Sequence, residues 1–288
     1  MLPGHTRYSF SYLPDRPDYS WPNDTRLAFY IATNLEHFAF KGGRTSTGVR
    51  QTHRDYASRD YGLRVGLAYL MDCFDELGVR VAHNVNSSLY GQRDRIFERI
   101  RARRDEIVAH GRTNSESQDD MWEHDEAHMI REVTEAIARN EGAAPTGWLG
   151  PARAETGATP DLLHEAGYRY IMDWPCDDQP FWMRTRTGRI LSVPYPLEVN
   201  DGRQQAPQEF ADIIVNQFDE MLELSSRRPL VCGIALHPFF SGHPFRLRPL
   251  RQALLHCVRH PQRERVWYAL PRAIAEHCYS LPAGVVTE

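Results

Sequence analysis

Lysine is almost missing from this 288-residue chain, because Lys41 is the only lysine among 34 basic residues. It lies in a glycine-rich stretch, which argues against a catalytic lysine that forms an imine in a desolvated pocket. Cysteines are also few, at positions 73, 176, 232, 257 and 278, and no two of them form a C-x-x-C pair. An odd number of widely spaced cysteines predicts buried free thiols in a reducing compartment.

Long apolar runs are absent as well. No run approaches the roughly 20 residues of a membrane span, and the first 22 residues lack the apolar stretch of a secretory signal. The net charge is −4 without a cluster of basic residues, so neither nucleic acid nor an anionic membrane is an expected partner. We therefore expect a cytoplasmic protein that acts on a small molecule.

The chain alternates strand and helix patterns. Residues 1–25 are rich in Pro, Tyr and Asp and predict an extended arm, whereas 26–288 show no linker and no repeat and predict one domain. Strands are predicted at 26–36, 79–86, 106–110, 145–150, 168–174, 189–195 and 229–237. Helices are predicted at 61–78, 93–104, 119–141, 159–167 and 208–225, with two more near the C-terminus. Such alternation predicts a parallel sheet, open or closed as a barrel.

Two helix boundaries carry residue-level signals. The helix at 159–167 is predicted to begin with Thr159 as its N-cap and Pro160 at the first helical position. Gly78 is predicted to end the helix at 61–78.

Polar residues follow six of the predicted strands, where chemistry gathers in parallel α/β folds. They are Asn34, Glu36 and His37, then His110, then Arg153, then Asp173, Asp177 and Asp178, then Tyr195, Glu198, Asn200 and Asp201, and finally His237. Each has a purely structural interpretation too: acids in turns, a turn at His110, and packing for Trp148, Trp174 and Tyr195. Their recurrence at equivalent places favours a site with acids, bases and a charge stabiliser, which suits hydrolysis.

Several motifs resemble the polysaccharide deacetylase (NodB-homology) superfamily, and within it the branch of the purine-catabolic allantoinase that lacks the urease-type metal centre. These motifs are NLE (34–36), YGLRVG (61–66), AHG (109–111), GWLGPAR (147–153), DWPCDDQPF (173–181), VPYPLEVND (193–201) and LHPFFSGHPFR (236–246). The resemblance implies a single-domain, distorted (β/α)7 barrel with its active site at the C-terminal mouth of the strands.

The resemblance also implies roles for individual residues. Metal-dependent members use two acids, an H-x-x-x-H pair of metal ligands, an arginine that orients the catalytic acid and a late histidine as general acid. Glu36 stands near the motif-one acids, His110 and Asn114 stand at the two histidine positions, Arg153 lies near the arginine motif, and His237 matches the late histidine.

The metal motif is incomplete in this chain. Asn114 replaces one of the two histidines, and an amide oxygen is a poor ligand for zinc. Glu36 and His110 would then be the metal ligands, with His37, His53 or Asp178 able to complete the set. Both a zinc site and a site without metal stay open, and we favour the latter.

The resemblance predicts hydrolysis of a C–N bond in a small cyclic ureide or imide. Glu36 or Asp178 would be the base and His237 the acid. His110, Asn114 and backbone N–H groups near Gly150 would hold the carbonyl, and Asp177 would accept ureide N–H groups.

The remaining expectations concern the pocket wall and the alternatives. Arg153 is a further predicted substrate contact, and Trp148, with Trp174, Phe181, Trp182 and Phe239, predicts an aromatic wall. A metal-dependent N-deacetylase of an acetylated amino sugar or acetamide is the second hypothesis, and a non-catalytic ligand-binding relative is the third. The arm and the resemblance predict a homo-oligomer, with a tetramer as the candidate assembly.

Overall fold

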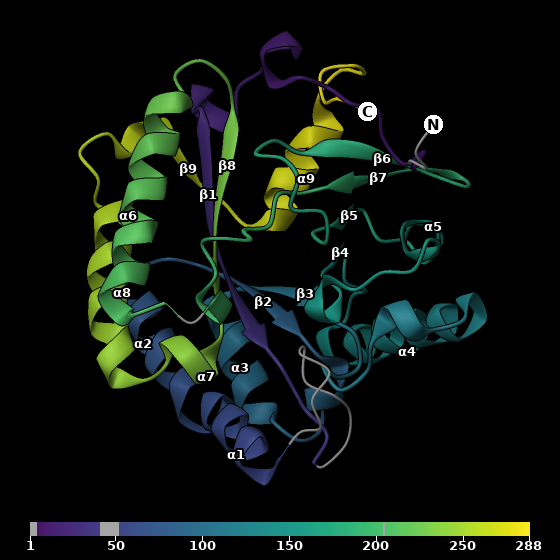
Figure 1. The fold of residues 1–288 in the computed structure, drawn as a ribbon, viewed down its shortest axis with the longest axis vertical. Helices are drawn as coiled ribbons and strands as arrows, with labels where there is room; N and C mark the ends of the chain where they lie inside the picture. The colour runs from purple at the N-terminus through teal and green to yellow at the C-terminus, as the bar shows by residue number, and fades with distance from the viewer. Residues whose placement is uncertain (1–4, 41–51, 204) are drawn as a thin grey trace.

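Seven parallel strands form the centre of the molecule. The computed structural model describes residues 5–40, 52–203 and 205–288, so Lys41 lies outside the described residues. The parallel strands are β1 (Leu27–Leu35), β2 (Ala82–Val85), β3 (Glu106–Ala109), β4 (Gly147–Trp148), β5 (Tyr170–Ile171), β7 (Gly188–Ser192) and β8 (Leu230–Leu236). They pair in the order β7-β5-β4-β3-β2-β1-β8 (Figure 1). Each corresponds to one of the seven predicted strands.

Between β7 and β8, the barrel is closed by a segment without regular secondary structure and not by strand pairing. Beyond β7, Val199 accepts a hydrogen bond from the backbone N–H of Ala235 at 3.0 Å, and Asn200 forms an isolated parallel bridge with Ala235 on β8. The two ends of the strand order therefore meet through one short contact. This is the distorted (β/α)7 barrel that the sequence predicts, and the fold class is confirmed.

Two further strands lie outside the predicted set. β6 (Phe181–Thr185) runs antiparallel to β7, and β9 (Val266–Tyr268) adds to β1. Both become strands by pairing with β7 and β1, and a local sequence pattern does not show such pairing. They were missed for that reason.

Most of the helices cover the outside of the strands, and α9 covers one end of the barrel. They are α1 (His53–Tyr61), α2 (Leu67–Leu77), α3 (Asp94–Arg103), α4 (Glu123–Glu141), α5 (Thr159–Glu165), α6 (Pro207–Leu224), α7 (Pro238–Ser241), α8 (Pro244–Val258) and α9 (Pro271–Ser280). α2, α6 and α8 pack their apolar faces on β1 and β8, and α4 and α5 pack on the other side of the barrel (Figure 1). The described helical run before Gly78 starts earlier than predicted, because α1 and a π-helical turn (Gly62–Gly66) precede α2.

One of the two boundary predictions is confirmed. Gly78 ends α2 in the left-handed region, with φ of 69°, and its N–H donates to carbonyls of the last turn. The N-cap prediction is wrong: Ala158 is the N-cap of α5. The Thr159 hydroxyl instead donates to the buried Glu126 carboxylate on α4.

The C-terminal helix α9 closes the end of the barrel opposite the mouth. Ile274, Ala275 and Cys278 pack with the side chains that β1 sends inward. Glu106, at the start of β3, is buried there and accepts hydrogen bonds from the Tyr170 hydroxyl (2.5 Å) and from the Arg272 backbone N–H (3.0 Å) in the first turn of α9. Burial raises the pKa of Glu106 to about 7.

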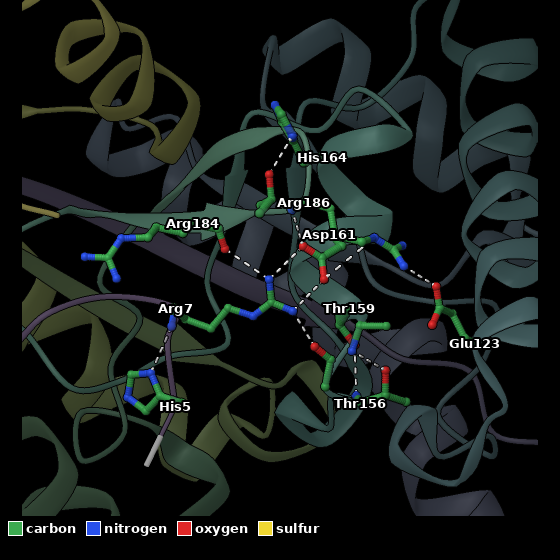
Figure 2. A network of polar contacts seen from close by, with 12 residues as sticks. His5, Arg7, Glu123, Thr156, Thr159, Asp161, His164, Arg184 and Arg186 are labelled. Carbon is green, nitrogen blue, oxygen red and sulfur yellow. Dashed lines mark hydrogen bonds and ion pairs between the residues drawn. The ribbon is translucent and has the colours of Figure 1, made fainter.

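The described N-terminal segment is tied to the barrel by ion pairs. Arg7 donates to both oxygens of Asp161 (2.7 and 2.6 Å) and to the carbonyls of Arg184 and Gly157 (Figure 2). Arg16 forms a second two-pronged pair with Asp177, at 2.7 Å for both contacts. Arg7 thus contacts α5 and β6 and Arg16 contacts the loop after β5, so this segment lies along the fold.

The structure tests two expectations that were drawn from composition, on the cysteines and on membrane spans. Four of the five cysteines are buried free thiols, but Cys176 is exposed, which corrects the expectation that all are buried. Within the described residues, no helix combines the length and apolar character that a membrane crossing requires.

Candidate active site

Glu36 and His237 face each other at the C-terminal mouth of the barrel. Glu36 follows β1 and His237 follows β8, and these neighbouring strands pair as far as Thr33 and Leu236. The Glu36 Oε1 atom lies 3.6 Å from the His237 Nε2 atom, and both side chains are largely buried. An acid and an imidazole from different strands therefore meet where parallel α/β folds place their chemistry.

Asp201 fixes the His237 ring. Its carboxylate accepts hydrogen bonds from the His237 Nδ1 atom (2.6 Å), the His237 backbone N–H (2.8 Å) and the Ser241 hydroxyl (2.5 Å). With Nδ1 donating to Asp201, the His237 Nε2 atom points at Glu36. The sequence marked Asp201 only as one of several strand-end polar residues; its place in the VPYPLEVND motif was the available signal.

The protonation states of Glu36 and His237 depend on the ionisable side chains close to them. Burial by itself lowers the pKa of His237, but the Asp201 and Glu36 carboxylates outweigh it and raise the pKa to about 10. Burial likewise works to raise the pKa of Glu36, yet His237 and His110 hold it well below its ordinary value. At neutral pH Glu36 is thus an ionised base and His237 is a protonated acid.

His110 presents an acceptor to the mouth. Its Nδ1 atom lies 2.6 Å from the Leu149 carbonyl oxygen, which can only accept, so Nδ1 carries the proton. The Nε2 atom is buried, has no hydrogen-bond partner among the described residues, and lies 3.7 Å from Glu36 Oε1. In the neutral ring this atom accepts from water or a substrate N–H, whereas in the charged ring it donates to Glu36 and holds the pKa of that carboxylate down. The predicted contact of His110 with the substrate stays a prediction.

Asn114 adds a second free acceptor. Its backbone N–H donates to the His37 carbonyl at 2.9 Å, which anchors the loop after β3 to the loop after β1. Its Oδ1 atom is buried and has no partner in the described part of the chain. The two residues at the H-x-x-x-H positions therefore both leave a buried acceptor atom unpaired.

The donor set of the mouth does not match a tight zinc site. Glu36 and His110 are two ligands of suitable type, but His237 is held by Asp201 and carries a proton. His37 is bonded to Ser88 at 2.8 Å, and His53 is an exposed residue at the start of α1. Catalytic zinc sites use three protein ligands. Among the described residues, three potential ligands converge only at Asp219, His256 and His260, outside the mouth.

Arg153 supplies an uncommitted positive charge. It follows β4 in a tight turn in which Ala152 and Arg153 have φ of 56° and 57°. Burial raises the pKa of Tyr195 and of Asp173, and the Arg153 charge acts in the opposite direction on both. Its guanidinium has no hydrogen-bond or ion-pair partner in residues 5–40, 52–203 and 205–288. It is therefore free to bind an anionic or carbonyl oxygen.

Gly150 does not offer the backbone donor predicted for it. Its N–H donates to the Asp173 Oδ1 atom at 2.8 Å, so it is already used. The glycine is required by the crowded turn, because a Cβ there would lie 2.9 Å from the Ala154 carbonyl oxygen. The Gly150 N–H itself is therefore not free to act as the predicted oxyanion donor, whereas the Arg153 guanidinium is available as a donor.

The predictions for Asp177 and Asp178 are wrong. The Asp178 carbonyl accepts from the Val231 N–H at the start of β8, six residues before His237. At about 3.3 Å per strand residue this places Asp178 roughly 20 Å from the mouth. Asp177 is occupied by Arg16 and by the Gln179 N–H. Both acids belong to the opposite end of the barrel, so Glu36 is the remaining candidate base.

Trp148 does not line the mouth either. It is fully buried on the outer face of the barrel and packs edge-on against Tyr168 under α4 and α5. Alternate strand residues point to opposite faces, and its neighbour Leu149 points into the barrel interior. Trp182 packs in the interior cluster as well, whereas Phe239 contacts the His237 ring at 5.4 Å between centroids.

Comparison with known proteins gives structural relatives only. No protein-family model matches the chain, and no curated protein matches it. A probable polysaccharide deacetylase from Pseudomonas aeruginosa PAO1 is 25% identical with a TM-score of 0.77, over 90% of this chain and 93% of that one. The Puue allantoinase is 22% identical with a TM-score of 0.82, over 95% and 96%.

A third likeness concerns a protein without activity. A CE4 family pseudoenzyme from Bacillus anthracis is 9% identical with a TM-score of 0.52, over 87% of this chain and 64% of that chain. The resemblance expected from the motifs is thus confirmed at the level of the whole fold: this chain has the NodB-like barrel of the polysaccharide deacetylase superfamily.

Proposed function

We propose that the protein is a hydrolase of non-peptide C–N bonds, and that its substrate is a small cyclic ureide or imide. The observation that carries this proposal is the Glu36–His237 pair, 3.6 Å apart, in which the neighbouring charges lower the pKa of the carboxyl group and raise that of the imidazole. A carboxylate that can take a proton and an imidazolium that can give one are the two groups that amide hydrolysis requires.

The reaction follows from the positions of these groups. Glu36 removes a proton from a water molecule as its oxygen bonds to the substrate carbonyl carbon. Arg153 stabilises the negative charge that develops on the carbonyl oxygen. His237 then donates its Nε2 proton to the departing nitrogen as the C–N bond breaks, and Asp201 holds the ring in line during the transfer.

The acceptor atoms of the mouth support a substrate rich in N–H groups. His110 Nε2 and Asn114 Oδ1 are buried and unpaired, so a ligand that donates to them relieves the cost of leaving them without a partner. Ureides and imides carry N–H groups next to the carbonyl that is attacked. The allantoinase among the structural relatives adds support for this substrate class.

The step needs no metal as we propose it. Glu36 activates the water directly, and the described residues of the mouth offer no third ligand of the kind zinc prefers. Turnover that persists after exhaustive chelation and dialysis supports this, whereas turnover that is abolished by chelation and restored by zinc contradicts it.

The test is a screen of cyclic ureides, imides and N-acetyl compounds with the purified protein. Glu36→Gln and His237→Ala are each expected to lower kcat by about 10²- to 10⁴-fold on the substrate that is turned over. Asp178→Asn is the matched control, because that acid lies at the opposite end of the barrel, and its kcat should stay within about twofold. Wild-type rates in both Glu36→Gln and His237→Ala would refute the assignment.

A second candidate is an N-deacetylase of a small acetamide. It is favoured by the probable polysaccharide deacetylase that shares 25% of its residues with this chain. Zinc-dependent release of acetate from N-acetyl compounds, without turnover of any ureide or imide, would replace our proposal with this one. Tight ligand binding without any turnover would point instead to a non-catalytic relative, as in the CE4 pseudoenzyme.

A further inference from the structure

Two buried carboxyl groups lie beside the mouth and have no part in the reaction above. Asp173 follows β5, and Glu155 follows the turn that carries Arg153 after β4. They face the same region between the two loops, since Asp173 contacts Gly150 and Glu155 contacts Trp174. Neither forms an ion pair with an arginine or a histidine within the described residues.

Each carboxyl group uses one oxygen to join the two loops. The Gly150 N–H donates to Asp173 Oδ1 at 2.8 Å, and the Trp174 Nε1 atom donates to Glu155 Oε2 at 2.9 Å. A backbone N–H of the loop after β4 thus donates to an acid of the loop after β5. In turn, a side chain of the loop after β5 donates to an acid of the loop after β4. The second oxygens, Asp173 Oδ2 and Glu155 Oε1, are buried and have no donor.

A single proton satisfies these two oxygens together. Each of the two carboxyl groups acts on the other as a hydrogen-bond partner, and two carboxylate oxygens are both acceptors, so a hydrogen bond between them requires a hydrogen on one of them. We propose that Asp173 and Glu155 share one proton, and that this carboxyl pair clamps the β4 loop to the β5 loop and so holds Arg153 at the mouth.

The electrostatic surroundings favour the shared proton. Burial raises the pKa of Glu155 to about 9, with the Asp173 and Glu126 charges adding to it. Burial raises the pKa of Asp173 to about 7, and the Gly150 N–H, His110 and Arg153 act against it. Glu126 of α4 is itself satisfied by the Gln118 side chain and the Thr156 and Thr159 hydroxyls. Loss of the shared proton leaves two like charges in contact.

Arg153 depends on this clamp because its turn is strained. Ala152 and Arg153 both have positive φ without being glycine, a conformation that persists only where the surroundings impose it. Within the turn, the Arg153 N–H donates to the Gly150 carbonyl at 2.8 Å, and Gly150 is the residue that Asp173 holds. Repulsion between Asp173 and Glu155 would therefore loosen the base of the turn and displace the Arg153 guanidinium.

The role of Arg153 in this inference rests on the proposed function, but the clamp itself can be tested without substrate. Glu155→Gln keeps the size of the side chain, and its amide group can donate to Asp173 and accept from Trp174 without titrating. Asp173→Asn does the same from the other side and serves if the first variant folds poorly. Glu135→Gln, which removes an exposed carboxyl group of α4, is the matched control.

The first measurement is the thermal unfolding midpoint from pH 5 to pH 10. An acid whose folded pKa lies above its unfolded value binds a proton more tightly in the folded state, so stability falls as pH rises from about 4.5 to about 9. We expect wild type and Glu135→Gln to lose roughly 5 °C more than Glu155→Gln over this range. Parallel curves for all three proteins would overturn the shared proton.

The second measurement is the infrared carbonyl band of a protonated carboxylic acid in the folded protein at pH 8. Wild type and Glu135→Gln should show the band, and Glu155→Gln and Asp173→Asn should both lose it. A band that persists in both of these variants would overturn the proposal. If a turnover assay is in hand, the alkaline limb of kcat/KM should move to higher pH in Glu155→Gln. An unmoved limb with the band lost would leave the clamp standing and remove its link to Arg153.

Discussion

At the scale of single residues, hydrogen bonds orient the two histidine rings at the mouth. The Nδ1 atom of His237 donates to the Asp201 carboxylate and that of His110 donates to the Leu149 carbonyl, and both Nε2 atoms face Glu36. His237 lies between two carboxylates that favour its protonated form, whereas the Nδ1 atom of His110 meets a neutral carbonyl. His237 is therefore the better placed of the two to act as an acid.

Asn114 provides the sharpest test of the metal question at this scale. Replacing Asn114 by His restores two imidazoles four positions apart, beside Glu36. We expect Asn114→His to bind zinc at least about tenfold more tightly than wild type, because imidazole nitrogen replaces an amide oxygen as ligand.

Competition with a chromophoric zinc chelator measures this affinity, and Asn140→His on the exposed end of α4 is the control for added surface histidine. Stoichiometric, submicromolar zinc binding by the wild type, with no gain in Asn114→His, would contradict the view that position 114 limits the metal site.

At the scale of elements, close contact between helical segments positions the segment after His237. The Gly66 Cα atom, in the π-helical turn, lies against Gly242 and the Pro238 carbonyl at the ends of α7. A Cβ atom at Gly66 would lie 2.1 Å from the Pro238 carbonyl oxygen. α7 begins with Pro238, directly after His237, so this contact helps to position His237.

Gly66→Ala is expected to lower the free energy of unfolding by about 1–3 kcal/mol, because backbone has to move to make room for the methyl group. It should also lower kcat, since Pro238 moves with His237. Chemical denaturation measures the first effect and the turnover assay the second. Gly157→Ala is the control, since a Cβ there meets nothing within 4 Å; equal stability of the two variants would count against the tight contact.

Some helices and strands could be predicted from the local sequence pattern and others could not. The seven parallel strands could be predicted because each lies in a segment that separates two helix patterns, or a helix pattern and the arm, and that is followed by polar residues. β6 and β9 could not, since a short antiparallel strand and a short edge strand become strands through pairing with β7 and β1. Thr159 matched an N-cap by type, but the nearby Glu126 carboxylate takes its hydroxyl.

At the scale of the whole molecule, the two ends of the barrel have different tasks. The mouth holds Glu36, His237 and Arg153, and the other end holds α9, the buried Glu106 and the pair of Arg16 with Asp177. In α/β barrels, residues at the C-terminal ends of strands serve catalysis and those at the opposite end serve stability.

Asp177→Asn tests this division. Arg16 and Asp177 are mostly buried, so the variant leaves a guanidinium without its carboxylate and should lose about 2 kcal/mol of unfolding free energy. Its kcat/KM should stay within about twofold of wild type, because Asp177 is on the far side of the barrel from Glu36. A large loss of kcat/KM with unchanged stability, measured by denaturation and turnover, would return Asp177 to the active site.

Assembly is the other property of the whole molecule. The homo-oligomer and the extended arm at 1–25 stay predictions, and light scattering coupled to size-exclusion chromatography measures the former.

By itself, the sequence determined which segments of the chain form the seven parallel strands. Its motifs indicated the barrel class and the residues that lie near the mouth after β1, β3, β4 and β8. Those features follow from local hydrophobic patterning and from motifs read along one segment at a time. Only the tertiary structure decided that Asp178 is remote, that Trp148 faces outward, that Asp201 orients His237 and that Asp173 meets Glu155. Each of these depends on which strand end or loop lies across from it, and that pairing is set when the ring of strands closes.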